Sequence, residues 1–154
     1  WREWKNVKGG RKKINERRKE RKKTDPLFKL KTAMRSRLYI AIKRGNYTKR
    51  SKTYEYLGGD YSTATKHLES QFTDCMNWEN MGTKPDGTPG WDIDHRRPCA
   101  SFNLKIEDKK YMCFHWTNCQ PMWSPENKKK LAKFDPETFE YEWKGRELGW
   151  QLKI

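Results

Sequence analysis

The chain contains one Val and six Ile in 154 residues, and this shortage of branched aliphatic side chains limits what it can fold into. The central strands of a large parallel sheet are runs of Val, Ile and Leu, so a Rossmann-type or barrel enzyme is excluded. Aromatic residues make up 14% of the chain and can still build a small core, because each one buries a large area. We therefore expect a small folded body beside a segment that has no core of its own.

The positive charge is concentrated in the first third of the sequence. Residues 1–50 contain 20 Lys and Arg against 4 Asp and Glu, whereas residues 51–154 contain 15 against 16. Residues 11–23 include one apolar residue in thirteen, so they can form a solvated helix or an extended arm that orders on phosphates. This asymmetry indicates a polyanionic partner. A surface charged only for solubility is less favoured, because solubility is usually served by mixed signs.

Two amphipathic helices are predicted before residue 75. The first begins at Asp25-Pro26, a favoured N-cap and first-turn pair, and ends at Gly45-Asn46. Its apolar face consists of Leu27, Leu30, Met34, Leu38 and Ala41, and its basic side chains predicted to contact phosphate are Arg35, Arg37, Lys43 and Arg44. The second covers residues 61–74, after a turn at Gly58-Gly59, with a face of Ala64, His67, Leu68, Gln71 and Phe72.

The sequence context of His67, His115 and the cysteines favours packing in the core over metal binding. His67 lies on a helix face and His115 lies between aromatic residues, so both are expected to be packed imidazoles. The four cysteines, Cys75, Cys99, Cys113 and Cys119, include no C-x-x-C pair of the kind that holds zinc. We expect reduced, mostly buried thiols, and the spacing opposes a zinc-finger-like DNA reader.

Residues 91–133 carry the pattern that indicates chemistry. Residues 91–95 alternate like a short strand that ends before Pro98, and residues 117–123 read as a second strand. Ser124-Pro125 then reads as a helix start, with Ser124 as the cap and lysines continuing the helix to residue 133. The segment 99–111 between the strands is predicted to be a long loop.

Three pieces of this region form one motif: Asp94-His95-x-x-Pro98, then Thr117-Asn118-x-Gln120-Pro121-x-Trp123, then Asn127 followed by lysines. Together they resemble the ββα-metal motif of HNH endonucleases, most closely the freestanding enzymes of phages and large DNA viruses, over roughly residues 25–132. The resemblance implies that His95 is the general base and that Asp94 and Asn127 bind the metal. It also implies that Asn118 steadies the loop that carries the base.

The chemistry of phosphodiester hydrolysis agrees with these roles. A neutral imidazole can take a proton from water near neutral pH. One carboxylate and one amide oxygen suit Mg²⁺ or Mn²⁺, whereas zinc would want more nitrogen or sulfur ligands. Asp92 is either a carboxylate that supports Asp94 or a solvent-facing residue. Lys128, Lys129 and Lys130 either hold a phosphate beside the metal or form a solvated helix face.

The sequence thus predicts an α+β, mostly helical fold with a small ββα-metal (HNH) core. Residues 1–50 are expected to form a basic helical nucleic-acid-binding arm, residues 51–134 the nuclease domain with its preceding helix, and residues 135–154 an aromatic tail packed on the body. The residues of the most basic stretch expected to bind nucleic acid are Arg11, Lys12, Lys13, Arg17, Arg18, Arg21, Lys22 and Lys23.

The expected function is Mg²⁺- or Mn²⁺-dependent cleavage of double-stranded DNA by an intracellular, non-secreted monomer or homodimer with no membrane partner. The alternative is an HNH-derived, non-catalytic nucleic-acid-binding protein, such as an RNA-bound component of a ribonucleoprotein. Asp94, His95, Asn118 and Asn127 are all present, and this favours the enzyme. A site that has lost its activity has no physical need to keep both the metal ligands and the base.

Overall fold

The computed structural model describes residues 10–45, 48, 52–82, 86–137 and 139. In chain order its elements are α2 (Gly10–Thr24), α3 (Pro26–Arg44), α4 (Thr53–Leu57), α5 (Tyr61–Glu69), β1 (Trp91–His95), η1 (Cys99–Ser101), α6 (Glu107–Phe114), η2 (Trp116–Asn118), β2 (Cys119–Trp123) and α7 (Ser124–Lys130). In the described residues the fold is mostly helical, with one two-stranded antiparallel sheet. The prediction of an α+β, mostly helical fold is confirmed.

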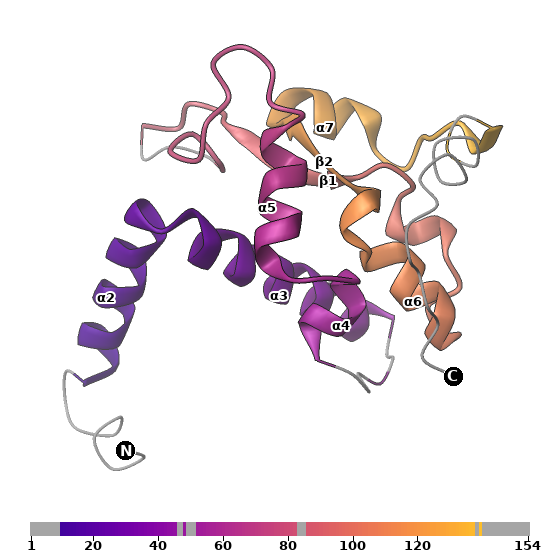
Figure 1. The fold of residues 1–154 in the computed structure, drawn as a ribbon, viewed down its shortest axis with the longest axis horizontal. Helices are drawn as coiled ribbons and strands as arrows, with labels where there is room; N and C mark the ends of the chain where they lie inside the picture. The colour runs from indigo at the N-terminus through magenta and orange to yellow at the C-terminus, as the bar shows by residue number, and fades with distance from the viewer. Residues whose placement is uncertain (1–9, 46–47, 49–51, 83–85, 138, 140–154) are drawn as a thin grey trace.

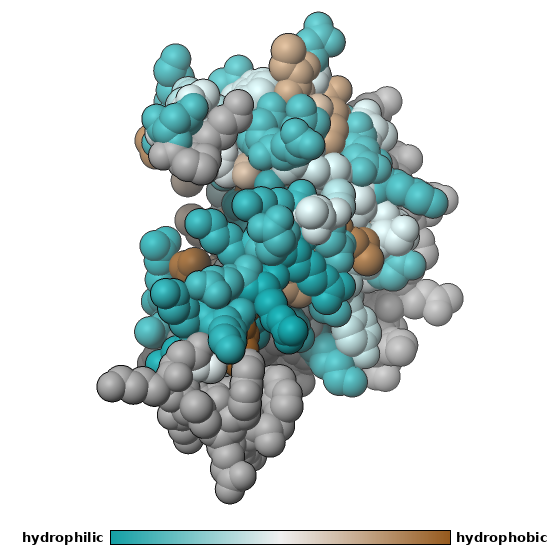
Figure 2. Space-filling view, turned by 90° about the vertical axis from the view of Figure 1, so that its left-hand side faces the viewer, coloured by the Kyte–Doolittle hydropathy of each residue, from teal (hydrophilic) through white to brown (hydrophobic). Residues whose placement is uncertain are grey.

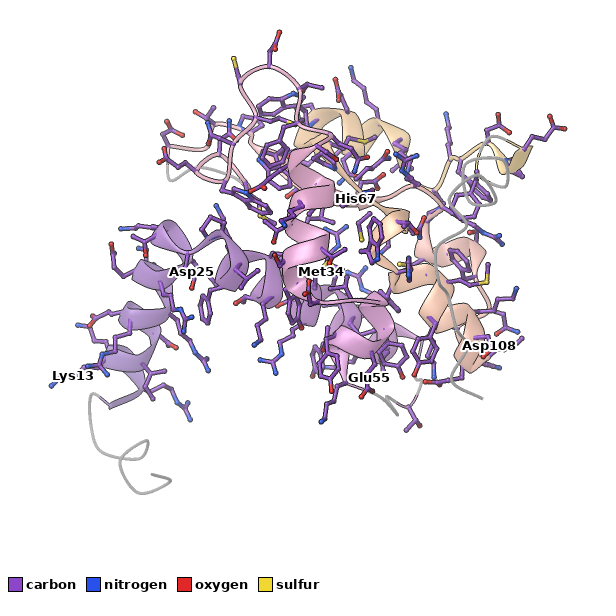
Figure 3. All side chains as sticks on the ribbon, in the orientation of Figure 1. Lys13, Asp25, Met34, Glu55, His67 and Asp108 are labelled. Carbon is purple, nitrogen blue, oxygen red and sulfur yellow. The ribbon has the colours of Figure 1, made fainter. Side chains whose placement is uncertain are left out.

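Helix α2 projects from one side of the body as a solvated helix (Figure 1). Lys13 lies on its outer part, away from the other elements (Figure 3), and the face of the molecule on this side is largely hydrophilic (Figure 2). Of the two forms allowed by its sequence, the basic stretch therefore adopts the helix. With Ile14 as its one large apolar residue, α2 has no apolar face to bury, which explains why it leaves the body.

The junction between α2 and α3 is fixed at Asp25, as the sequence predicts. Asp25 Oδ1 accepts a hydrogen bond from the Phe28 backbone N–H at 2.8 Å, and this bond holds the pKa of the Asp25 carboxyl below its usual value. Arg21 completes the junction, because its Nε lies 3.0 Å from Asp25 Oδ2 and its guanidinium lies over the Phe28 ring. The direction in which the arm leaves the body is thus set by local contacts.

Helix α3 joins the two parts of the core. Its buried residues are Leu30, Met34, Leu38 and Ile42. The first two pack in a cluster with α5 and the sheet, and the last two pack in a second cluster with α4, α6 and the segment before α6. Leu27 was predicted to be buried but is 44% exposed. The buried residues of α3 are spaced four positions apart, so the next position before Leu30 on the same face is 26 and not 27.

Aromatic side chains build the first cluster, as the composition suggests. Trp91 of β1 is fully buried, with ring centroids of Phe72 and Trp78 at 5.0 and 5.3 Å. Its indole N–H donates to the Asn77 carbonyl at 2.7 Å, so the polar atom of the ring is satisfied. The first strand of the sheet is therefore anchored at its start by an aromatic core.

The strands pair antiparallel with Trp91 opposite Trp123 and His95 opposite Cys119. The predicted first strand is confirmed, but the second begins at Cys119 instead of residue 117, because the preceding residues form the 3₁₀ turn η2.

The predicted long loop over residues 99–111 is wrong, since η1 and the start of α6 lie within it. The apolar residues of α6 are gathered in its last turn, so no helical period shows in the sequence.

Two predicted helix ends also differ. Helix α5 ends at Glu69, with Ser70 as its C-cap, and not at residue 74. Helix α7 ends at Lys130 because Leu131 adopts a positive φ of 52°. Ser124 does not cap α7: its hydroxyl donates to Asp92 Oδ2 at 2.6 Å instead.

The end of the described chain packs on the body. Phe139 is buried, its ring centroid lies 6.4 Å from that of Phe134, and both rings lie near the Arg97 guanidinium. The remainder of the predicted aromatic tail, at residues 138 and 140–154, lies outside the described residues. Within the described part of the chain, none of the helices has both the length and the apolar character needed to cross a membrane.

Replacement of Gly58 by Ala is expected to destabilise the protein by roughly 2–4 kcal/mol. Gly58 ends α4 with a φ of +74°, and a Cβ atom there would collide with the ring of the buried His115. Gly59→Ala is the matched control, because its Cβ would lie in ordinary contact, 3.6 Å from the Trp116 ring. The measurement is the urea midpoint followed by Trp fluorescence, and equal midpoints for the two variants would contradict this packing.

Candidate functional site

The two faces of β1 contact different elements. Trp91 and Ile93 point into the core formed with α3 and α5, whereas Asp92 and Asp94 make hydrogen bonds to residues of α7. Alternation of side chains along a strand produces this separation. The predicted metal ligand Asp94 therefore lies on the side of the sheet that α7 covers.

The Asp94 carboxylate is buried, with 6% of the residue exposed, and it is paired with a cation. Its Oδ2 accepts hydrogen bonds from Lys130 Nζ at 2.6 Å and from Gln120 Nε2 at 2.8 Å. Lys130 Nζ also donates to the His95 carbonyl at 2.6 Å. The end of β1 thus carries a buried negative charge that attracts a positive group from α7.

His95 lies next to Asp94 in sequence, but its ring faces the opposite side of the sheet. The ring packs edge-on against Phe114 of α6, with centroids 5.7 Å apart, and lies close to two sulfur atoms, those of Cys99 and Cys113. His95 is 6% exposed, and its Nε2 is a buried atom without a hydrogen-bond partner among the described residues. The expectation that Asp94 and His95 face opposite sides is confirmed.

Asn118 is fully buried and joins three segments. Its Oδ1 accepts from the Arg97 backbone N–H at 2.9 Å, and its Nδ2 donates to the Arg97 carbonyl at 3.0 Å and to the Cys113 carbonyl at 2.8 Å. Its own carbonyl accepts from the Arg96 backbone N–H at 2.8 Å. The side chain therefore ties the turn after His95 to the last turn of α6.

Asn127 lies half-buried on α7, three residues before Lys130, and these two positions share one face of the helix. Within the described residues no hydrogen bond joins Asn127 to Asp94. Lys128 and Lys129 are exposed. The structure thus brings the helix of Asn127 against the strand of Asp94, while His95 is on the other side of that strand.

The donor set at the end of β1 fits a small hard cation. The described contacts of Asp94 use Oδ2 alone, and the ammonium of Lys130 shows that a positive charge is accommodated there. The amide oxygen of Asn127, on the helix that packs against β1, would be the second hard donor. Carboxylate and amide oxygens with water are the ligands that Mg²⁺ and Mn²⁺ prefer. Asp94 and Asn127 would hold such an ion in place of the Lys130 ammonium.

The remaining predicted side chains have structural partners. Asp92 accepts from Ser124, so it links β1 to α7. His115 is buried against Thr117, with Nδ1 2.8 Å from Oγ1, and burial lowers the pKa of its imidazole to about 4. His67 Nε2 lies 2.9 Å from the Cys119 carbonyl. Both histidines are packed, as expected.

Sequence reasoning missed a cluster on the core side of β1. One ring nitrogen of His95 and the sulfurs of Cys99 and Cys113 all lie within 4.8 Å of one another. The two sulfurs are 3.2 Å apart, and the Cys113 thiol donates to Cys99, which lowers the pKa of Cys99 and raises that of Cys113. The sequence signal was the spacing His95-x-x-x-Cys99, which a search for C-x-x-C pairs does not detect. The reduced state expected for these cysteines agrees with their free thiols.

Almost all of the predicted basic residues are exposed. The predicted contacts on α2 are exposed, and Lys43, Arg44 and Arg35 are exposed on α3, whereas Arg37 is half-buried. Tyr39 and Ile40 of α3 are also exposed, at 63% and 45%. The arm therefore offers a dense row of cations with few acidic residues among them.

Two curated proteins of Acanthamoeba polyphaga mimivirus, both uncharacterized, are similar to this chain. One is 42% identical over 125 residues, which cover 81% of this chain and 52% of that protein. The other is 36% identical over 111 residues, which cover 72% of this chain and 45% of that protein. The chain spans about half the length of the curated relatives it matches. No family profile and no solved structure matches it.

Asn118→Ala is expected to lower the free energy of unfolding by about 3 kcal/mol or more, since it leaves buried backbone groups of Arg97 and Cys113 unpaired at roughly 1–3 kcal/mol each. Asn127→Ala, at a half-buried position of α7, is the matched control and should change stability by less than about 1 kcal/mol. Urea unfolding at pH 7 gives both values. A loss in Asn118→Ala no larger than in the control would contradict the steadying role.

Proposed function

We propose that the chain is a divalent-metal-dependent endonuclease of the HNH type that cleaves DNA through a site at the end of β1. The observation that carries the proposal is the buried Asp94 carboxylate paired with the Lys130 ammonium, at the position that precedes His95 in β1. A buried carboxylate that already binds one cation is suited to exchanging it for another. The sequence resemblance to the ββα-metal motif supplies the reaction class.

Asp94 and Asn127 are the residues that would hold the metal ion. When bound, Mg²⁺ or Mn²⁺ supplies charge neutralisation on the phosphate and on the leaving oxygen. Lys130, displaced from Asp94, is a cation that can bind a non-bridging phosphate oxygen, and Lys128 and Lys129 are exposed beside it on α7.

His95 is proposed to take the proton of the attacking water. Its Nε2 makes no hydrogen bond to the described residues, so this ring nitrogen is not engaged by the described part of the fold. The base role requires the ring to turn from the Cys99 and Cys113 side toward the phosphate. Asn118 holds the backbone of Arg96 and Arg97, so it fixes the turn that directly follows His95.

Helices α2 and α3 are proposed to supply affinity. Phosphate contacts from Lys and Arg dominate non-specific DNA binding, and each contact releases counterions. The twelve cations of residues 1–24, against three acidic residues, provide many such contacts without base recognition.

A non-catalytic nucleic-acid-binding protein is the second candidate. It is favoured by two features that work against catalysis: the Lys130 ammonium on Asp94, and the 6% exposure of His95. Preference for structured RNA over duplex DNA, together with an absence of cleavage in any divalent metal, would establish this candidate over the nuclease.

His95→Ala is expected to lower the rate of plasmid nicking in Mg²⁺ by ~10²–10⁴, because general-base removal has this effect. DNA affinity should stay within a few-fold, since the imidazole contributes little to phosphate binding. His67→Gln is the control: it changes a packed histidine and should nick at nearly the wild-type rate. Undiminished nicking by His95→Ala would remove this residue from the mechanism.

The role of α2 in DNA binding is tested by substituting three of its exposed lysines together. The variant Lys12→Gln, Lys13→Gln, Lys19→Gln should flatten the dependence of log affinity on log salt by about 2–3, at ~0.9 per phosphate contact. A control variant carries the same change at three exposed lysines of the body, Lys66, Lys105 and Lys133, and should keep the wild-type slope. Equal slopes in the two variants would show that α2 is not a DNA contact.

A further inference from the structure

Three soft metal donors meet on the core side of β1, away from the oxygen donors of Asp94 and Asn127. His95 ends β1, Cys99 begins η1, and Cys113 lies in the last turn of α6. Their ligand atoms lie within 4.8 Å of one another, Cys113 is fully buried, and the buried Nε2 of His95 has no hydrogen-bond partner among the described residues. A histidine ring that has an unpaired buried nitrogen and packs beside two thiols is an unusual arrangement for a core.

We infer that His95, Cys99 and Cys113 form a binding site for a thiophilic cation such as Zn²⁺. The site has three protein ligands, so a fourth position remains for water or another donor. Binding forms two Zn–S bonds and one Zn–N bond and releases the two thiol protons to solvent, with no change of oxidation state. Asn118 holds the site together, because it bonds to the backbones of Arg97 and Cys113.

The distance between the sulfurs favours a metal over a disulfide. Two thiolates on a tetrahedral zinc, each at about 2.3 Å, lie about 3.8 Å apart, whereas the sulfurs of a disulfide lie about 2.0 Å apart. The observed separation of Cys99 and Cys113 is 3.2 Å. Opening the pair around a cation therefore needs a shift of roughly half an ångström, and closing it to a disulfide needs about twice that.

The charges of the cluster also balance. Two thiolates, one neutral imidazole and one divalent cation carry no net charge, so the loaded cluster can stay buried beside Phe114 and Phe102 without an unpaired ion. Cys119, the other buried thiol, is outside the group: its sulfur lies 3.7 Å from the His115 carbonyl, and burial raises its pKa to about 12.

Occupancy of this site has a consequence that rests on the proposed function. A ring that binds Zn²⁺ through His95 cannot turn to accept the proton of the attacking water. Zinc would therefore act as an inhibitor of Mg²⁺-dependent nicking, through a site separate from Asp94 and Asn127. A cation bound to Cys99 and Cys113 would therefore determine whether His95 is available as the base for a reaction beside Asp94.

The test is a Co²⁺ titration of the full chain under a thiol-free reductant, followed by visible and near-ultraviolet absorption. We expect one Co²⁺ per chain, a sulfur-to-cobalt charge-transfer band and tetrahedral d–d bands, all removed by Zn²⁺. Cys99→Ser and His95→Gln should each lose or weaken these bands, whereas Cys75→Ser, at an exposed thiol outside the cluster, should keep them. Circular dichroism of each variant checks that it folds.

Absence of the charge-transfer band in folded wild type, or its survival unchanged in folded Cys99→Ser, would overturn the site. A disulfide between Cys99 and Cys113 found by mass spectrometry after purification without reductant, together with no cobalt band after reduction, would assign the pair to redox chemistry instead. The nuclease proposal is tested separately: Zn²⁺ should inhibit nicking by wild type but not by Cys99→Ser. Absence of nicking in Mg²⁺ would reject the nuclease and leave the cobalt result standing.

Discussion

The structure around the candidate site depends on the buried side chain of Asn118. A carboxamide with no exposed surface bonds to both backbone groups of Arg97 and to the carbonyl of Cys113. These bonds satisfy backbone groups that neither the two-stranded sheet nor α6 satisfies, and an unpaired buried group is costly. They also fix the relative positions of the end of β1, the turn to η1 and the end of α6. Asp94, His95, Cys99 and Cys113 all lie on these segments.

Local signals in the sequence predict the elements that carry strong patterns. Asp25-Pro26 marks the start of α3 because a cap and a first-turn Pro act within a few residues, and β1 is found because its alternation is strict. Helix α6 is missed because its apolar residues are gathered in its last turn. Ser124 is misjudged as a cap because Asp92, thirty-two residues earlier, competes for its hydroxyl. Such long-range partners have no local signature.

The site is partly predictable for the same reason. Asp94, His95, Asn118 and Asn127 are recognisable as a motif, and the motif implies their roles. It does not reveal that the His95 ring packs against Phe114 or that Cys99 and Cys113 lie beside it, because those contacts follow from the position of α6. One histidine at a strand end thus has hard donors on one side of the sheet and soft donors on the other. We propose that it serves phosphodiester chemistry when the soft site is empty.

The most direct test of this account is the nicking of supercoiled plasmid by zinc-free protein in Mg²⁺, with wild type and Asp94→Asn compared at matched concentration. The account predicts that wild type produces nicked circles in Mg²⁺ or Mn²⁺ and none in EDTA. It also predicts that Asp94→Asn is slower by at least ~10², since the carboxylate would be the charged ligand for the cation. Wild type that nicks in no divalent metal, or Asp94→Asn that nicks as fast as wild type, would contradict it.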